Sequence, residues 1–345
     1  MLVVAPHATR SGSTRVLLDV LAHLRQELGL GLAVEVRAPG PLSGELERFG
    51  RPLAIGEVPS LVLANTALAA DALLDRPPGV RTAVYLHESG EVLATLPART
   101  AAGLRSADLV FCVSQTIADA AVAFGVGPDR VLLVPPMVAA RPVPAEDARA
   151  RARANASVPP GQRLIVGCGE ARWAKGADLF VALAGQLASD PSLHFAWVGR
   201  RVRLFARMLD HDVASLDLGG RLTWVGDVDD AGPFLAAAEV VVMPSRDDSQ
   251  PLVPLEAALV GTPTAAFAIG GLADLGDAGA AGTAPYPDTA ALAAVVRRLL
   301  DQPADGATLV VAARERIAAS QAPDVVGPRI VAALHALLSD PVAAP

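Results

Sequence analysis

The sequence predicts two α/β domains in tandem, each a doubly wound parallel sheet with helices on both faces. Short apolar runs rich in β-branched residues alternate with segments of helical periodicity, which is typical of β–α–β units. The alternation stops at a proline-rich stretch, residues 135–161, and then restarts. A chain of 345 residues with 52% hydrophobic composition is long enough to form two such domains, each with its own core.

The first half of the chain reads as strands and helices in regular alternation. We expect residues 1–145 to form the first domain, and we expect the stretch before residue 161 to be an interdomain linker with some helix. Strands are expected at residues 2–5, 33–36, 61–64, 82–86, 109–113 and 131–134, and helices at 16–28, 67–74 and 116–124.

The second half repeats the pattern and ends in helices. We expect a second domain over residues 146–322, and an amphipathic helix within 323–345 that crosses back to pack on the first domain. Strands are expected at residues 163–168, 194–198, 221–225, 240–243 and 264–268, and helices at 178–188, 232–238, around Glu256, at 290–300, 307–319 and 325–338.

Charge and composition exclude several classes of protein. The net charge of −7 argues against the broad basic surface of a nucleic-acid-binding protein, and no apolar segment is long enough to span a membrane. The first residues lack the basic region of a signal peptide, so we expect a cytoplasmic protein. Cys112 and Cys168 lie far apart in apolar runs and are expected to be buried free thiols.

One arginine-rich stretch could bring positive charge to a surface. Arg200, Arg203 and Arg207 are spaced to share one face of a helix. We interpret this face as solvent-exposed, with contact to an acceptor phosphate or a membrane surface as the alternative.

The most informative segment is residues 240–263. An apolar, β-branched run ends at Pro244, a polar loop follows, and Gly261 has the position of a helix C-cap. Proline costs little in the first turn of a helix. Pro251 and Pro254 therefore favour a helix that begins near them and ends at Gly261. Carboxylates therefore lie on both sides of a helix N-terminus, which suits an anionic or hydroxyl-rich ligand.

This segment resembles the acidic pair E-x7-E of the retaining glycosyltransferases of family four, in the variant P-S-x-E-D-x-x-P-L-V-x-L-E-A. The first acid of the pair is here Asp248, an aspartate where the pair has glutamate, and the second is Glu256. The resemblance implies that Glu256 binds the ribose hydroxyls of a nucleotide sugar. It also implies that Asp248 or Asp247, with nearby groups, binds the donor sugar; we include Ser245, Leu252 and Val253 among these groups. The alternative is that Glu256 only complements the helix dipole.

Residues 164–180 resemble the phosphate loop of the same family, commonly G-x-x-x-W-R-K-G-x-D-L-F. Lys175 takes the place of the motif lysine, which the resemblance implies pairs with the donor diphosphate. Glu170 and Ala174 stand where the family has arginines, so Arg172 is the nearest replacement. An ordinary exposed Arg172 and Lys175 is the alternative, but cations at a helix N-terminus are unfavourable without an anion.

Two segments of the first half resemble family features on the sugar side. Gly12, in the loop after the first strand, matches the N-terminal glycine loop, whose helix we expect Ser11 or Ser13 to cap. His87, after the strand at 82–86, matches a histidine that approaches the donor sugar, preceded by Asn65-Thr66 at a strand end. A helix-opening turn and a structural histidine are the alternatives.

The acidic triplet Asp227-Val228-Asp229 has the form of the D-x-D metal motif of another glycosyltransferase fold. It directly precedes a predicted helix, so we interpret Asp229 or Asp230 as a helix cap and expect no bound metal.

Together these resemblances imply the GT-B fold, with two Rossmann-like domains facing across a cleft. They imply a metal-independent retaining glycosyltransferase without a cofactor, with His87, Asp248, Lys175 and Arg172 as catalytic residues. The expected donor is a UDP-sugar and the acceptor bears a hydroxyl group. The alternatives are a non-catalytic nucleotide-sugar-binding partner and a nucleotide-sugar epimerase on the same fold.

Overall fold

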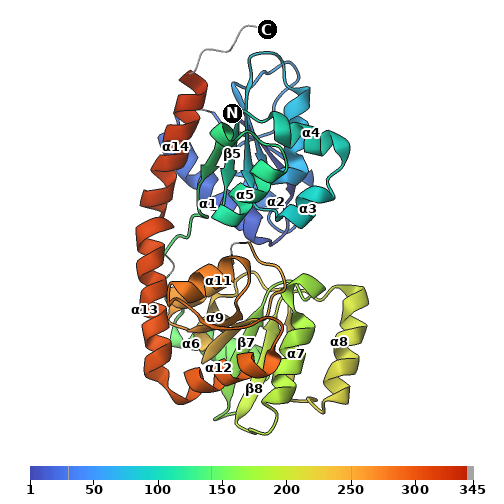
Figure 1. The fold of residues 1–345 in the computed structure, drawn as a ribbon, viewed down its shortest axis with the longest axis vertical. Helices are drawn as coiled ribbons and strands as arrows, with labels where there is room; N and C mark the ends of the chain where they lie inside the picture. The colour runs from blue at the N-terminus through green and yellow to red at the C-terminus, as the bar shows by residue number, and fades with distance from the viewer. Residues whose placement is uncertain (30, 141, 250, 340–345) are drawn as a thin grey trace. The chain divides into compact units, whose positions relative to one another are not determined.

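The computed structural model describes residues 1–29, 31–140, 142–249 and 251–339. Internal contacts divide the chain into two compact units: Met1–Ala139 with Ala318–Pro345, and Ala140–Ile317. In each unit, helices flank a central sheet (Figure 1). No helix among the described residues combines the length and apolarity that a bilayer crossing demands.

The first unit is built on a parallel sheet of six strands in the order β2-β1-β3-β4-β5-β6. Its central strands are largely apolar, and every residue of β3 is buried, because helices cover both faces of the sheet. The strands are β1 (Leu2–His7), β2 (Ala33–Ala38), β3 (Leu61–Asn65), β4 (Arg81–Leu86), β5 (Leu109–Cys112) and β6 (Val131–Leu133).

Side-chain caps begin two of the helices in this unit, and the cap at Ser11 is as predicted. Ser11 accepts from the Thr14 amide, and Ser114 accepts from the Ile117 amide at 3.4 Å. The helices are α1 (Gly12–Glu27), α2 (Ser43–Glu47), α3 (Gly90–Ala94), α4 (Ala98–Ser106), α5 (Gln115–Ala123) and α14 (Pro323–Ser339), with a short 3₁₀ turn η2 (Pro128–Arg130).

The helix predicted at residues 67–74 is instead a 3₁₀ helix, η1 (Ala67–Asp75). Ala67, Ala70 and Leu73 are all buried, and their spacing of three matches the 3₁₀ period, in which residues i and i+3 are eclipsed. Helix α4 lies against this segment: a Cβ on its Gly103 would be only 2.0 Å from the Ala70 carbonyl oxygen. The prediction of an α-helix was wrong because the sequence does not separate these two periods over so short a segment.

The last helix, α14, packs on α1 of the first unit (Figure 1). Gly327 allows the close approach, because a Cβ there would be 2.2 Å from Nε2 of His23 on α1. The Val138 amide donates to the Gln321 carbonyl at 2.8 Å, and Arg329 donates to the Leu133 carbonyl at 2.7 Å. The C-terminal helix therefore completes the unit that the N-terminus begins.

The second unit has a parallel sheet in the order β12-β11-β10-β7-β8-β9, the order typical of dinucleotide-binding folds. Two doubly wound parallel sheets were predicted, and the prediction is confirmed. The strands are β7 (Arg163–Cys168), β8 (Leu193–Val198), β9 (Leu222–Gly226), β10 (Val240–Met243), β11 (Thr264–Phe267) and β12 (Gly282–Ala284).

Alternating side chains of β7 divide between two cores. Ile165 packs in a core with residues of α7, α8 and α12, whereas Leu164 and Val166 pack with residues of α6, α9 and α10. The helices are α6 (Glu146–Asn155), α7 (Ala177–Gln186), α8 (Arg203–Ser215), α9 (Gly232–Ala237), α10 (Val253–Val260), α11 (Gly270–Asp277), α12 (Thr289–Asp301) and α13 (Pro303–Ser320), with a 3₁₀ turn η3 (Trp173–Lys175).

Two further predictions concern the arginine-rich surface and the two cysteines. Helix α8 begins at Arg203, so Arg200 precedes the helix and pairs with Glu170, and the prediction that Arg200 shares a helical face was wrong. Cys112 and Cys168 are buried free thiols, as predicted.

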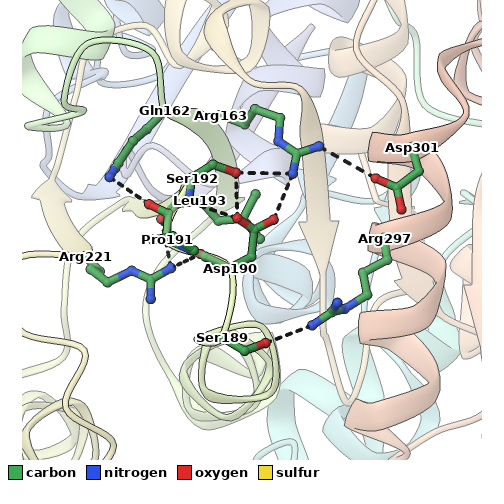
Figure 2. Close-up of polar contacts among 10 residues, drawn as sticks. All are labelled: Gln162, Arg163, Ser189, Asp190, Pro191, Ser192, Leu193, Arg221, Arg297 and Asp301. Carbon is green, nitrogen blue, oxygen red and sulfur yellow. Dashed lines mark hydrogen bonds and ion pairs between the residues drawn. The ribbon is translucent and has the colours of Figure 1, made fainter.

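A polar network fastens the loop between α7 and β8 at the amino ends of the strands (Figure 2). One oxygen of Asp190 accepts from the amide and the hydroxyl of Ser192 at 2.9 and 2.6 Å, and the other accepts from Arg163 at 2.8 Å. Arg221 donates to the Asp190 and Leu193 carbonyls. The hydrogen bonds from Ser192, with Arg163, lower the pKa of Asp190.

We expect Asp190→Ala to lower the free energy of unfolding by about 1–2 kcal/mol at neutral pH, because it leaves the Ser192 donors and Arg163 without their acceptor. A carboxylate with a lowered folded-state pKa stabilises the fold above its ordinary pKa, and that contribution is lost as pH falls through the folded-state value. Urea denaturation at pH 7 and near pH 2.5 measures both effects. A deficit that stays the same in acid would contradict the assignment.

Candidate functional site

The second unit brings its predicted site residues together at the switch point of its sheet. From β7 the chain runs outward through β8 and β9, then returns beside β7 as β10 and runs outward the other way. In open α/β sheets, ligands bind outside the carboxyl ends of the strands at such a point. The loops that follow β7 and β10 carry both sequence motifs.

The loop after β7 is shaped by close backbone approaches. Gly169 has φ of +135° and its carbonyl accepts from the indole nitrogen of buried Trp197 at 2.8 Å. Gly176, with φ of +68°, lies directly against the next loop, since a Cβ there would be 1.9 Å from the Pro244 carbonyl oxygen. The two loops are therefore in van der Waals contact, and Lys175 precedes the point where they touch.

An ion pair joins the two loops. Nζ of Lys175 lies 2.6 Å from Oδ2 of Asp248, and the Ser245 hydroxyl donates to the same oxygen at 3.2 Å. Asp248 and Ser245 are buried, whereas Asp247 is exposed. Of the two aspartates left open by the sequence, Asp248 is thus the one that faces Lys175.

The N-terminus of α11, which follows β11, also contacts Asp248. The Asp248 carbonyl accepts from the Gly271 amide at 3.0 Å. Gly270 has φ of +45°, and a Cβ on it would be 2.4 Å from the same carbonyl oxygen. The segments that follow three adjacent strands, β7, β10 and β11, therefore hold this residue in position.

Glu256 lies in the first turn of α10, where the sequence placed it. Leu252 is the N-cap residue and contributes no side-chain cap, Val253 is the first helical residue, and Gly261 ends the helix in the left-handed conformation, as predicted. The first amides of a helix have no acceptor within it. Glu256 is half-buried, so its carboxylate and this helix end can both meet a ligand.

Arg172, also predicted as a site residue, pairs with a different acid. Its Nε lies 3.8 Å from Glu170, and its side chain is more than half exposed. Glu170 also pairs with Arg200. The structure therefore places Arg172 with a neighbouring acid and not at the Lys175–Asp248 pair.

Sequence reasoning missed Arg246 and Asp178, which form a bidentate ion pair beside Lys175. Both lie within the quoted motifs, yet 68 residues separate them, and no spacing rule connects positions so far apart. The signal would have been their opposite charges on two loops that the strand order makes neighbours.

The first unit gathers its predicted residues around the ends of β1, β3 and β4. Gly12 is the first residue of α1, and Nδ2 of buried Asn65 donates to the Ser13 carbonyl at 3.5 Å. His87 follows β4 and is half-buried, with its ring 4.7 Å from that of Tyr85. Burial lowers the pKa of His87 to about 4, so the imidazole is neutral at physiological pH.

Glu88 connects the ends of β3 and β4. Its Oε2 accepts from the Ala67 amide at 3.0 Å and from the His87 amide at 3.2 Å. Burial raises the pKa of Glu88, although these amides and Thr66 oppose the rise. The carboxylate thereby fixes the backbone next to His87.

The interpretation of Asp229 or Asp230 as the cap of α9 was wrong. Oδ1 of Asp230 accepts from the Gly232 amide at 2.9 Å, but the N-cap position of α9 is Ala231. Asp230 therefore forms a turn one residue earlier than a helix cap. Over the described ranges, no three His, Cys, Asp or Glu side chains are grouped as metal ligands.

Comparison with known proteins agrees with the motifs. Residues 162–302 match the family model described as glycosyl transferases group 1. A D-inositol 3-phosphate glycosyltransferase of Kineococcus radiotolerans is 31% identical over 204 residues, which are 52% of this chain and 46% of that protein. D-inositol 3-phosphate glycosyltransferase 1 of Catenulispora acidiphila is 30% identical over 237 residues, 65% of this chain and 56% of that protein. The chain spans about half the length of these relatives.

Solved structures show the same fold. HepE of Anabaena, crystallised with UDP-glucose, superposes with a TM-score of 0.82 at 17% identity, over 97% of this chain and 99% of that one. Sucrose-phosphate synthase of Thermosynechococcus elongatus superposes with a TM-score of 0.81 at 21% identity, over 98% and 99%. The predicted fold class is confirmed by these neighbours.

We expect Gly176→Ala to lower the free energy of unfolding by more than the strain of a positive φ alone would cause. Gly279 has a similar φ, +65°, but a Cβ there would have no atom within 4 Å, so Gly279→Ala measures the angle cost alone, about 1 kcal/mol. Gly176→Ala adds the clash with the Pro244 carbonyl. Chemical denaturation of both variants compares the costs. Equal losses would show that the two loops separate easily.

Proposed function

We propose that the chain, a family-four-like glycosyltransferase of the GT-B fold, transfers a sugar from a UDP-sugar to a hydroxyl acceptor with retention of configuration. The observation that carries the proposal is the ion pair between Lys175 and Asp248 at the switch point of the second sheet, with Glu256 on the helix that follows. The HepE structures contain UDP, UDP with glucose, and UDP-glucose, which supports a uridine donor.

The arrangement suits a nucleoside diphosphate leaving group. Lys175 precedes the N-terminus of α7, and both the ammonium group and the helix amides favour a phosphate there. A diphosphate would compete with Asp248 for Lys175 and leave the Asp248 carboxylate to accept a hydrogen bond from a sugar hydroxyl. The negative charge that develops on the leaving diphosphate then lies beside the ammonium group of Lys175, which is already in place.

Glu256 and its neighbours are assigned to the rest of the donor. The Glu256 carboxylate accepts hydrogen bonds from two ribose hydroxyls in this proposal, and the first amides of α10, near Leu252 and Val253, face the same ligand. Ser245 holds Asp248, and Asp247 stays at the exposed edge of the site. We assign Arg172 to the donor diphosphate. The diphosphate carries more negative charge than Glu170 and would compete with Glu170 for the guanidinium group.

His87 and Gly12 are assigned to the sugar. A neutral imidazole can both donate and accept a hydrogen bond, so His87 can bind a sugar hydroxyl without a charge.

A cytoplasmic location is part of the same proposal.

The test is a thermal-shift screen of nucleotide sugars, followed by measurement of free UDP when the stabilising donor meets hydroxyl acceptors. Stabilisation by a donor and acceptor-dependent release of UDP would support transfer. Binding without release would favour a non-catalytic binding partner, and conversion of the donor sugar without an acceptor would favour an epimerase. Stabilisation by no nucleotide sugar would overturn the proposal.

We expect Glu256→Ala to weaken UDP binding by about 10- to 150-fold, because hydrogen bonds to a charged group contribute about 1.5–3 kcal/mol. Glu256→Gln keeps an acceptor without the charge and should lie between. Isothermal titration with UDP measures both variants. If Glu256 serves only the helix dipole, the unfolding midpoint will fall while UDP affinity stays at the wild-type value.

We expect transfer to depend on Lys175 and to need no divalent cation. Lys175→Gln can still donate to Asp248 but lacks the charge, so turnover should fall by about 100-fold or more. Chelation with EDTA should change turnover little. If EDTA abolishes transfer and Mg²⁺ or Mn²⁺ restores it, while Lys175→Gln remains active, a metal ion does the work assigned to Lys175.

A further inference from the structure

We propose that Arg246 is a positioning residue, which fastens the loop carrying Lys175 to the loop carrying Asp248. The contacts themselves are independent of function; their catalytic consequence rests on the proposed glycosyl transfer. Arg246 touches neither Lys175 nor Asp248 in any contact of the described structure, and it acts through the backbone on which they stand.

The guanidinium group of Arg246 makes contacts on both sides of Lys175. Nη1 and Nη2 donate to the two oxygens of Asp178 at 2.7 and 2.6 Å, and Nη1 also donates to the Trp173 carbonyl at 2.7 Å. The guanidinium carbon lies 4.8 Å from the centroid of the Trp173 ring. The Arg246 amide donates to the Ala174 carbonyl at 2.8 Å. One residue thus holds positions 173, 174 and 178.

The geometry is specific to arginine. A planar fork matches a carboxylate in two parallel hydrogen bonds and stacks on an aromatic ring, whereas an ammonium group can do neither as well. The side chain of Arg246 is 11% exposed and that of Asp178 is 27% exposed, so solvent screens this pair less than the exposed pairs of the surface.

The position of these contacts gives them a consequence for the ion pair. Arg246 lies two residues before Asp248, and Asp178 lies three residues after Lys175. The fork and the ion pair between Lys175 and Asp248 therefore close a small ring made of residues 175–178 and 246–248, and the contact of Gly176 with Pro244 lies beside this ring. Because a lysine stem is flexible, the separation of Nζ and Oδ2 depends on how firmly the two backbones are held.

The test compares Arg246→Lys with Arg163→Lys. Arg163 pairs with Asp190 at the opposite end of β7, at 2.8 Å and with both side chains about one third exposed, so it is a control for changing a paired arginine away from the site (Figure 2). Hydrogen exchange of the free protein follows the amides of Lys175 and Gly176, which donate to the Arg172 and Trp173 carbonyls. We expect exchange of these amides to become at least 10-fold faster in Arg246→Lys and to stay unchanged in Arg163→Lys.

The second measurement separates positioning from plain stability. In Arg246→Lys we expect kcat to fall 10- to 100-fold with a smaller change in donor KM, at an unfolding midpoint no lower than that of Arg163→Lys. Asp178→Asn, which keeps the shape but loses the charge, should give the same pattern and serves if Arg246→Lys does not fold. Adding Asp178→Asn to Arg246→Lys should lower kcat little further, because each substitution alone already breaks the ion pair between residues 246 and 178.

Each outcome decides a separate point. Unchanged exchange in Arg246→Lys and in Asp178→Asn would overturn the inference that this pair holds the loop. Faster exchange with unchanged kcat would overturn the positioning role. If the wild-type protein transfers no sugar from any nucleotide sugar, the proposed function fails, and the exchange measurement still decides whether the loop is held by Arg246.

Discussion

The hydrogen-bonded pairing of β7 with β10 is the constraint on which the second unit depends. It places the carboxyl end of the first strand of the unit beside that of the fourth, so two loops separated by about 70 residues leave the sheet side by side. The close contact of Gly176 with Pro244 and the ion pair between Lys175 and Asp248 both follow from this pairing. The same topology explains why the two motifs, although distant along the chain, specify one place in the fold.

The sequence predicted the strands better than it predicted what connects them. Buried parallel strands are apolar runs bounded by polar loops, and β7 and β10 have the bounds expected. Strand β12 and helix α11 were not predicted: the strand has three residues, and the helix begins with two glycines. The 3₁₀ helix after β3 was mistaken for an α-helix, because local periodicity does not report the close approach of α4.

The candidate site divides in the same way. Lys175, Asp248 and Glu256 could be found because a motif fixes each relative to a strand end or a helix start. The choice between Asp247 and Asp248 required knowledge of their burial, and the start of α11, at Gly270 and Gly271, contacts Asp248. The fork of Arg246 on Asp178 required the three-dimensional fold, since its two members are distant along the chain. Sequence motifs therefore predict which side chains bind a ligand, and the structure shows which contacts hold those side chains in place.

The packing of α14 on α1 has a consequence for how the protein is made. The first unit needs residues from both ends of the chain, whereas the second unit lies within one continuous stretch. During synthesis the second unit can close its core as soon as α13 has emerged, but the surface of α1 around His23 stays uncovered until Gly327 arrives. The first unit therefore begins before the second unit and is completed after it. A factor that shields this surface of α1 on the nascent chain would have to stay bound until α14 has been synthesised.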